Sequence, residues 1–118
     1  MKVGEKTYYA EKPSEFKLNK LFDNEYEAEY NEDIKEEAIY HGEEKVNQFV
    51  GTHYLSHCII NNYDETVSAL IWLKYSISDE IALLKKIQNK TDMEEVDEYC
   101  AYVEKCKKFA RAYWGIIK

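Results

Sequence analysis

Glycine and proline are scarce in this chain, which has four glycines and a single proline, Pro13, among 118 residues. Neither G-x-G-x-x-G nor G-x-x-x-x-G-K occurs, which argues against a phosphate-binding loop. No run of eighteen apolar residues is present and no apolar segment follows the first residues, so we expect neither a transmembrane helix nor a secretory signal. With 45% hydrophobic and 33% charged residues, the composition is typical of one globular domain.

Arginine is nearly absent, since Arg111 is the only arginine among 16 basic residues. The 23 acidic residues give a formal net charge of −7, and residues 25–44 alone carry nine carboxylates against Lys35, a local charge of −8. A field of this sign repels phosphate backbones, and lysine lacks the planar fork with which arginine contacts bases. Direct nucleic-acid binding is therefore not expected.

The three cysteines are an odd set, which predicts free thiols in a reducing compartment. On a helix, Cys100 and Cys106 would be rotated about 600° apart and would lie on different faces, so we do not expect them to pair. Cys58, like the other two, is interpreted as a small, partly buried core residue.

The residue pattern predicts an α+β fold in which an N-terminal arm and a small β-hairpin precede a C-terminal antiparallel helical hairpin. Residues 1–45 are expected to form an acidic, tyrosine-bearing arm, with a short helix after Pro13 and loose structure in the acidic stretch. Residues 46–118 are expected to form the core. Within 46–61, β-branched and aromatic residues favour strands with a bulge or turn at Gly51, although a helix over 47–60 is the alternative.

Residues 64–118 show helical spacing, with Asp64 as the expected first N-cap and a break at residues 89–92. In the last helix, acidic residues come first and basic residues last, as the helix dipole favours. Apolar residues also recur every seven positions, with a second set three residues later. This spacing predicts a packing seam that faces a neighbouring helix or a second chain, formed by Val96, Val103, Ala110 and Ile117 with Tyr99, Cys106 and Tyr113.

His53 and His57 are the only clustered residues with metal-ligand chemistry. On a strand they would stand about 13 Å apart, too far for one metal ion, whereas on a helix they could bind zinc together. The third ligand is missing, so we expect no metal, no cofactor and no catalytic residue. A small metal-dependent enzyme is the weakest of the alternatives.

Tyrosine is abundant, with eleven residues, and three of them are interspersed among the acids of the N-terminal stretch. Tyrosine is a rigid amphipathic residue that is enriched in protein interfaces. We therefore predict a partner-binding surface made of Tyr26, Tyr30, Tyr40, Glu25, Glu29 and Glu36.

Two C-terminal segments, LKYSISDEIALL at residues 73–84 and EYCAYVEKCK at residues 98–107, resemble short uncharacterised proteins of phages and prophages. The resemblance covers about 45 residues. The arrangement is loosely similar to the helical ends of phage tail-fibre assembly chaperones, without their aromatic–arginine run. The resemblance implies an assembly or virion role, in the virion or the host cytoplasm, and no catalytic residue.

Together these features predict a non-enzymatic phage protein that binds another protein, as a virion component or as a tail or fibre assembly factor. Its partner would be a phage structural protein or a host protein, with no membrane contact and with a homo-oligomer through the last helix as a further possibility. The alternative is an acidic inhibitor, encoded by a phage or mobile element, that occupies a basic nucleic-acid-binding groove of a host protein.

Overall fold

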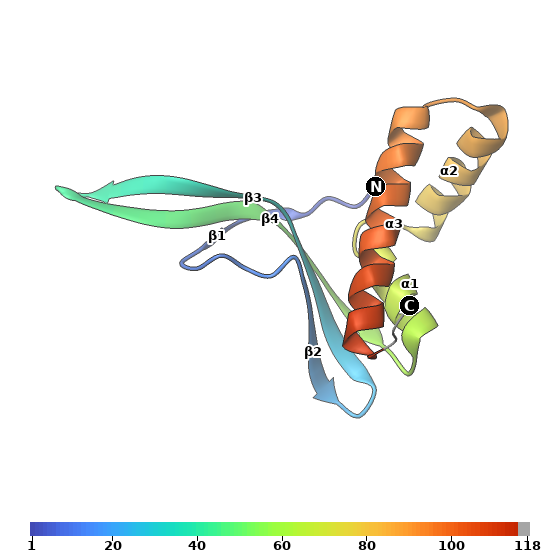
Figure 1. Cartoon of the computed structure of the whole chain (residues 1–118), viewed down its shortest axis with the longest axis horizontal. Helices are drawn as coiled ribbons and strands as arrows, with labels where there is room; N and C mark the ends of the chain where they lie inside the picture. Colours follow the sequence, from blue (N-terminus) through green and yellow to red (C-terminus); the bar gives the residue numbers. More distant parts are fainter. Residues whose placement is uncertain (116–118) are drawn as a thin grey trace.

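The computed structural model describes residues 1–115, which form a four-stranded antiparallel sheet followed by three helices (Figure 1). The strand order is β1-β4-β3-β2. The elements are β1 (Glu5–Tyr9), β2 (Phe16–Phe22), β3 (Glu25–His41), β4 (Glu44–Ile59), α1 (Tyr63–Ile71), α2 (Ile77–Asn89) and α3 (Met93–Tyr113). The α+β class is right, but the predicted arrangement of an arm, a small hairpin and a helical hairpin is wrong, because most of the N-terminal half belongs to one sheet.

The acidic stretch, which we expect from the sequence to be loose, forms the whole of β3 and the turn into β4. Tyr26, Ala28 and Tyr30 are buried beneath the helices, and the glutamates between them lie on the opposite face of the sheet. This is the period-2 alternation of a half-buried strand. The pattern is hidden in the sequence because glutamate, which has low strand propensity, fills the polar positions.

The segment after Pro13 is also a strand rather than the predicted short helix. Phe16 and Leu18 point toward the helices, and β2 pairs with β3 in a register that sets Phe16 opposite Tyr30. The same apolar residues fit one turn of helix, and pairing with β3 decides between the two structures.

The predicted hairpin within residues 46–61 is wrong, because β4 runs through Gly51 as one strand. Its hairpin partner is β3, and the connecting turn is Gly42-Glu43, with Gly42 at a φ of 67°. A two-residue loop that begins with a left-handed glycine suits the twist of paired strands. The irregularity lies across from Gly51, between Glu32 and Lys35 of β3.

α1 and α2 follow local capping rules, whereas Asp92 at the start of α3 makes no side-chain cap hydrogen bond. Asn62, rather than Asp64, caps α1 by accepting from the Glu65 backbone N–H, and Ser76 with Asp79 forms a capping box at α2. The predicted break over 89–92 is confirmed at residues 90–92, since α2 ends at Asn89. α2 and α3 form a helical hairpin, and α1 packs separately against α3.

The predicted seam of α3 packs within this chain. Val96, Cys106 and Ala110 are buried, Tyr99 and Val103 are half-buried, and Tyr113 is 42% exposed. Ile117 lies outside the described residues. Of the thiols, Cys106 is buried, Cys58 is half-buried and Cys100 is exposed, and none of the three is in a disulfide.

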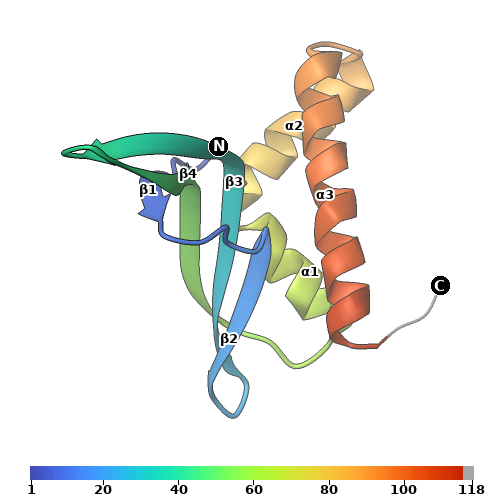
Figure 2. The same ribbon diagram turned by 60° about the vertical axis from the view of Figure 1, so that its left-hand side comes forward.

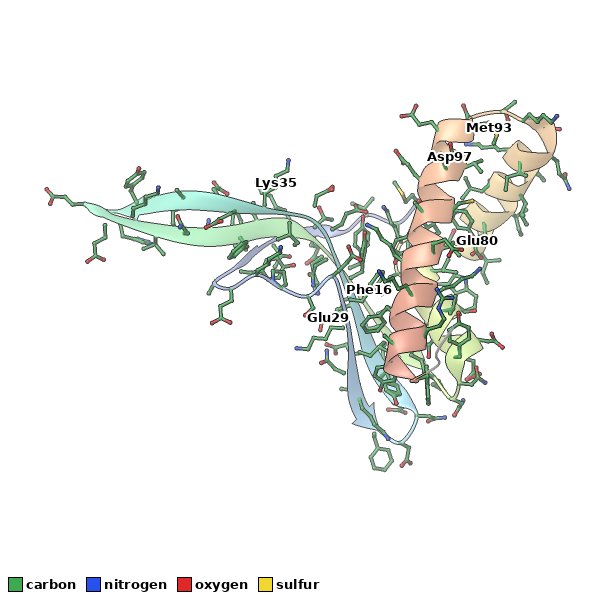
Figure 3. The ribbon with its side chains drawn as sticks, viewed as in Figure 1. Phe16, Glu29, Lys35, Glu80, Met93 and Asp97 are labelled. Carbon is green, nitrogen blue, oxygen red and sulfur yellow. The ribbon has the colours of Figure 1, made fainter. Side chains whose placement is uncertain are left out.

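An aromatic cluster joins the sheet to the helices. Phe16 stacks on Tyr30 at 4.8 Å between ring centroids and contacts Phe109 of α3 at 5.4 Å (Figure 3). Tyr102 meets Tyr30 edge-on at 4.9 Å, and its hydroxyl donates to the Leu70 carbonyl at 2.5 Å. Every buried side-chain polar atom in the described residues has a hydrogen-bond partner, so the tyrosine hydroxyls are accommodated inside this core.

The helices cover only part of the sheet. They pack on the half nearest the β2–β3 turn, and the far end of the β3–β4 hairpin extends away from them (Figures 1 and 2). We call residues 35–48 the arm and the remaining described residues the body. The molecule is accordingly elongated, with principal extents of 56 × 40 × 26 Å.

Candidate protein-binding site

The arm is a two-stranded ribbon with no buried side chain. Of its fourteen residues, 35 to 48, only Ile39 and Gln48 are half-buried and the others are exposed. Pairing of β1 with β4 ends at Phe49, and pairing of β2 with β3 ends at Tyr30. No described strand therefore covers either edge of the arm, and its outward backbone groups are open to a partner.

Each face of the arm carries one apolar or aromatic group. Ile39 lies opposite Val46 on one face, and Tyr40 lies opposite Lys45 on the other. Tyr40 is 70% exposed and Val46 is 41% exposed. Directly opposite residues of an antiparallel pair share a face, so a partner contacting either side of the ribbon meets at least one apolar or aromatic side chain.

The charges of the arm are unpaired within the described chain. Glu36, Glu37, Glu43 and Glu44 outnumber Lys35 and Lys45, and none of these six takes part in an ion pair among residues 1–115. Their net charge of −2 follows from four carboxylates and two lysines. Exposed charges along an open strand discourage self-association and leave the surface free for a partner of complementary charge.

A bulge in β3 lies at the base of the arm, where the sheet extends beyond the helices. Glu32 pairs with Thr52 and Glu36 with Phe49, so β3 has one residue more than β4 over this interval. Asp33 takes up the extra residue at a φ of 54°. Opposite the bulge, a Cβ on Gly51 would collide with the Ile34 side chain and lie 2.9 Å from the Glu32 carbonyl oxygen, so only glycine fits here.

A charged network ties this bulge to the helices. The Glu32 carboxylate pairs with Lys74 in the α1–α2 connection, and it accepts from the hydroxyls of Tyr30 at 3.3 Å and Tyr54 at 3.4 Å. Burial, followed by the Glu32 charge, raises the pKa of Tyr54, which keeps that hydroxyl protonated as a donor. Lys74 also lies over the Tyr102 ring, 5.4 Å from its centroid. The base of the arm is thus fixed to the body.

The structure separates the residues of the predicted partner surface. Tyr40 and Glu36 lie on the arm and are exposed, whereas Tyr26 and Tyr30 are buried in the body at 6% and 3% exposure. Buried side chains offer no contact surface in the folded chain, so we do not carry Tyr26 and Tyr30 forward as contact residues.

Glu25 and Glu29, the remaining predicted residues, face the two histidines across the solvent side of the sheet. His53 Nε2 lies 2.9 Å from Glu29 Oε1, and His57 Nε2 lies 3.8 Å from Glu25 Oε2. Asn19 Nδ2 donates to the other Glu29 oxygen at 2.6 Å, and Figure 3 labels Glu29 on this part of the sheet. No group of three or more His, Cys, Asp or Glu side chains within residues 1–115 is placed to hold a metal ion.

The sequence did not identify Ile39 and Val46 as candidate contact residues. They lie side by side only in the strand register that the turn at Gly42 fixes. The available signal was Gly42 itself, which follows Ile39-Tyr40 by two residues and precedes Val46 by four. Among the described residues, no helix has the length and apolarity needed to cross a bilayer. No family model, curated protein or solved structure matches this chain.

Proposed function

We propose that this protein acts by binding another protein through the arm, as a virion component or as a tail or fibre assembly factor of a phage. The observation that carries the proposal is an ordered fourteen-residue ribbon with no buried side chain and with both edges unpaired in the described chain. The phage setting is supported by the resemblance of residues 73–84 and 98–107 to short phage and prophage proteins.

The physical argument concerns what the arm does for the fold. Ordering a residue costs about 1–2 kcal/mol of backbone entropy, and a bare two-stranded hairpin recovers little of this by burial. The body contains the whole buried cluster, from Phe16 to Cys106, without any residue of the arm. A ribbon that is anchored at its base and contributes nothing to the core is well suited to contact with a partner.

The chemistry of the arm favours a partner that packs on a strand. Its edges offer main-chain groups for strand addition, and Tyr40 on one face and Ile39 with Val46 on the other supply the apolar contacts. Such an interface gains more from burial than from charge, so we expect it to persist at high salt.

The test is a pull-down from the source cells with the tagged full chain, washed at low and then at high salt, with retained proteins identified by mass spectrometry. Two variants are compared with the natural chain: Tyr40→Ser on the arm and Phe22→Ser at the β2–β3 turn. Both residues are highly exposed aromatics, at 70% and 69%, so both variants are expected to fold.

We expect phage structural or assembly proteins to be retained through high salt by the natural chain and by the Phe22 variant, and to be lost with the Tyr40 variant. Equal retention by all three chains would show that the arm is not the contact surface.

The second candidate is an acidic inhibitor that inserts into a basic groove of a host nucleic-acid-binding protein. The observation that favours it is the set of four unpaired carboxylates on the arm. Attraction of this kind is screened beyond about 8 Å at physiological ionic strength and beyond about 3 Å at 1 M salt. A basic host protein released between the low-salt and high-salt washes would favour the inhibitor over the assembly factor.

A further inference from the structure

The C-terminal part of β4, residues 54–59, forms a second open strand edge on the body, away from the arm. β1 pairs with β4 only at residues 49–53, and no described strand pairs with residues 54–59 on the side opposite β3. A groove of about 590 Å³ runs along this edge between β4 and α1. Its volume is within the range of about 300–1,000 Å³ typical of ligand pockets.

The groove exists because the residues on both of its sides are small. Ser56 and Cys58 of β4 face Ser68 and Ala69 of α1 across it. Larger apolar side chains stand at its margins, where Ile59 is 60% exposed and Trp72 is 41% exposed. A side chain entering from outside would therefore meet a shallow floor with apolar walls.

The N-terminal segment stays beside Tyr54 and Leu55, where Lys2 and Val3 line a cavity with them, but it makes no strand pair with this edge. Continuing the β1 register backward from the Glu5–His53 pair would set Val3 opposite Leu55 and Lys2 opposite Ser56. The chain turns away, and the Lys2 backbone N–H donates to the Lys74 carbonyl at 2.8 Å. Val3 is left 95% exposed, so β4 keeps free main-chain groups next to the groove.

The two ends of the groove differ in charge. Asp64 and Glu65 of α1 line one end, and Lys2 lies near the other, where its Nζ donates to the Trp72 carbonyl. Glu65 accepts from Asn61 through Oε1 only, and Asp64 has no ion-pair partner among the described residues. The carboxylates remain available to a cation on an incoming chain.

We propose that this groove binds an extended segment of a partner protein, which adds as a further strand to β4 and carries an apolar side chain followed or preceded by a lysine or arginine. The backbone pairs with residues 54–59, the apolar side chain packs against Trp72 and the small residues of the groove, and the cation meets Asp64 and Glu65. Main-chain pairing supplies affinity and the groove supplies specificity, as in other cases of strand addition. The site is separate from the arm and stands without the proposed function.

A second copy of this chain is a poorer occupant on charge grounds. If residues 54–59 of two copies paired with each other, two grooves that each carry Asp64 and Glu65 would come together. The chain as a whole also carries a net charge of −7. Like charges placed across an interface oppose association. A basic segment has the complementary charge.

The test selects eight-residue random peptides displayed on yeast with the fluorescently labelled full chain. We expect enriched peptides to alternate apolar residues and to contain lysine or arginine. The selected peptides are then titrated against three variants: Asp64→Lys at the groove, Ala69→Arg to fill it, and Glu43→Lys on the arm. The first and third change the net charge equally, so the arm variant is the matched control.

We expect the two groove variants to lose at least about tenfold in affinity and the arm variant to change by less than about twofold at physiological salt. In ¹⁵N-labelled protein, amide shifts should change at residues 54–59 and in α1. Thermal melts report whether each variant is folded. A chain whose arm has been removed should bind the same peptides equally well, which separates this site from the proposed function.

Three results would overturn the inference. One is the absence of any enriched peptide, and another is binding that Ala69→Arg leaves intact. The third is a concentration-dependent dimer whose shifts map to residues 54–59, which would assign the edge to a second copy.

Discussion

The near half of the β3–β4 hairpin lies beneath the helices, and its far half, the arm, projects beyond them (Figure 2). Both halves belong to the same two strands and both are rich in glutamate. In the near half, Tyr26, Ala28 and Tyr30 are buried at alternate positions, whereas no residue of the arm is buried. The difference shows that covering by the helices, rather than strand character, decides which part of the hairpin stabilises the fold.

The largest expected effect compares one tyrosine from each half. Tyr30→Ala removes a buried ring that packs on Phe16 and Tyr102, and large-to-small changes of aromatic core residues cost about 3–5 kcal/mol. Tyr40→Ala removes an exposed ring and should change the free energy of unfolding by less than about 0.5 kcal/mol. Urea unfolding of both variants measures the difference, and similar losses would contradict the division into body and arm.

The boundary between the halves is tested by Gly51→Ala. The added Cβ would collide with Ile34 and approach the Glu32 carbonyl, so we expect a loss of about 1–3 kcal/mol by overpacking. Combining it with Ile34→Ala should recover only part of the loss, because the backbone contact remains. A single variant as stable as the natural chain would mean that the bulge is not constrained by Gly51. Thermal unfolding is a sufficient measurement.

Acid should lower the stability of the body through Asp79, which lies in the body and not in the arm. The amino group of Met1 donates to this carboxylate at 2.8 Å and, with the Ser76 cap, lowers the pKa of Asp79 to about 2. Since the folded pKa is below the unfolded value of about 3.9, the contribution is complete above pH 4 and is lost as pH falls toward 2.

Because water surrounds the 55% exposed amino group, we expect this contribution to be on the order of 1 kcal/mol. Asp79→Asn should reduce the stability at pH 6 and flatten its decline between pH 4 and pH 2. Urea midpoints across that interval measure both effects. A parallel pH profile for the variant would assign the acid sensitivity to other carboxylates.

The smallest effect on stability is expected from shortening the arm, with residues 38–47 replaced by an Asn-Gly turn between Glu37 and Gln48, which pair directly. The free energy of unfolding should change by less than about 0.5 kcal/mol. Burial raises the pKa of the Cys106 thiol to about 12, so thiol labelling at this residue reports opening of the body. Faster Cys106 labelling in the shortened chain would show that the arm supports the core.

Local rules predicted the helical half well and the sheet poorly. The break at 89–92 and the buried positions Val96 and Ala110 follow from the helical period, which depends on neighbours within one turn. Local patterns predict a short helix and loose structure where β2 and β3 lie, because the strand character of these segments depends on pairing with residues far along the chain. Phe16 opposite Tyr30, and Glu32 opposite Thr52, are contacts that no local pattern specifies.

The candidate site divides in the same way. Tyr40 and Glu36 are predicted from the mixture of tyrosines and acids in residues 25–44 and are exposed on the arm, whereas Tyr26 and Tyr30 of the same stretch are buried. The groove beside β4 was not identifiable, because it is lined by residues 56–59 and by residues of α1 whose proximity depends on packing.

The charge, the periodicity of the helices and the glycine of the β3–β4 turn can be read directly from the amino-acid sequence. These properties depend on residue type and on close neighbours. Contacts between residues far apart in the chain set which face of each strand is buried, where the body ends and the arm begins, and which edges stay unpaired. The three helices cover just one part of the sheet, and a side chain's burial depends on what packs over it.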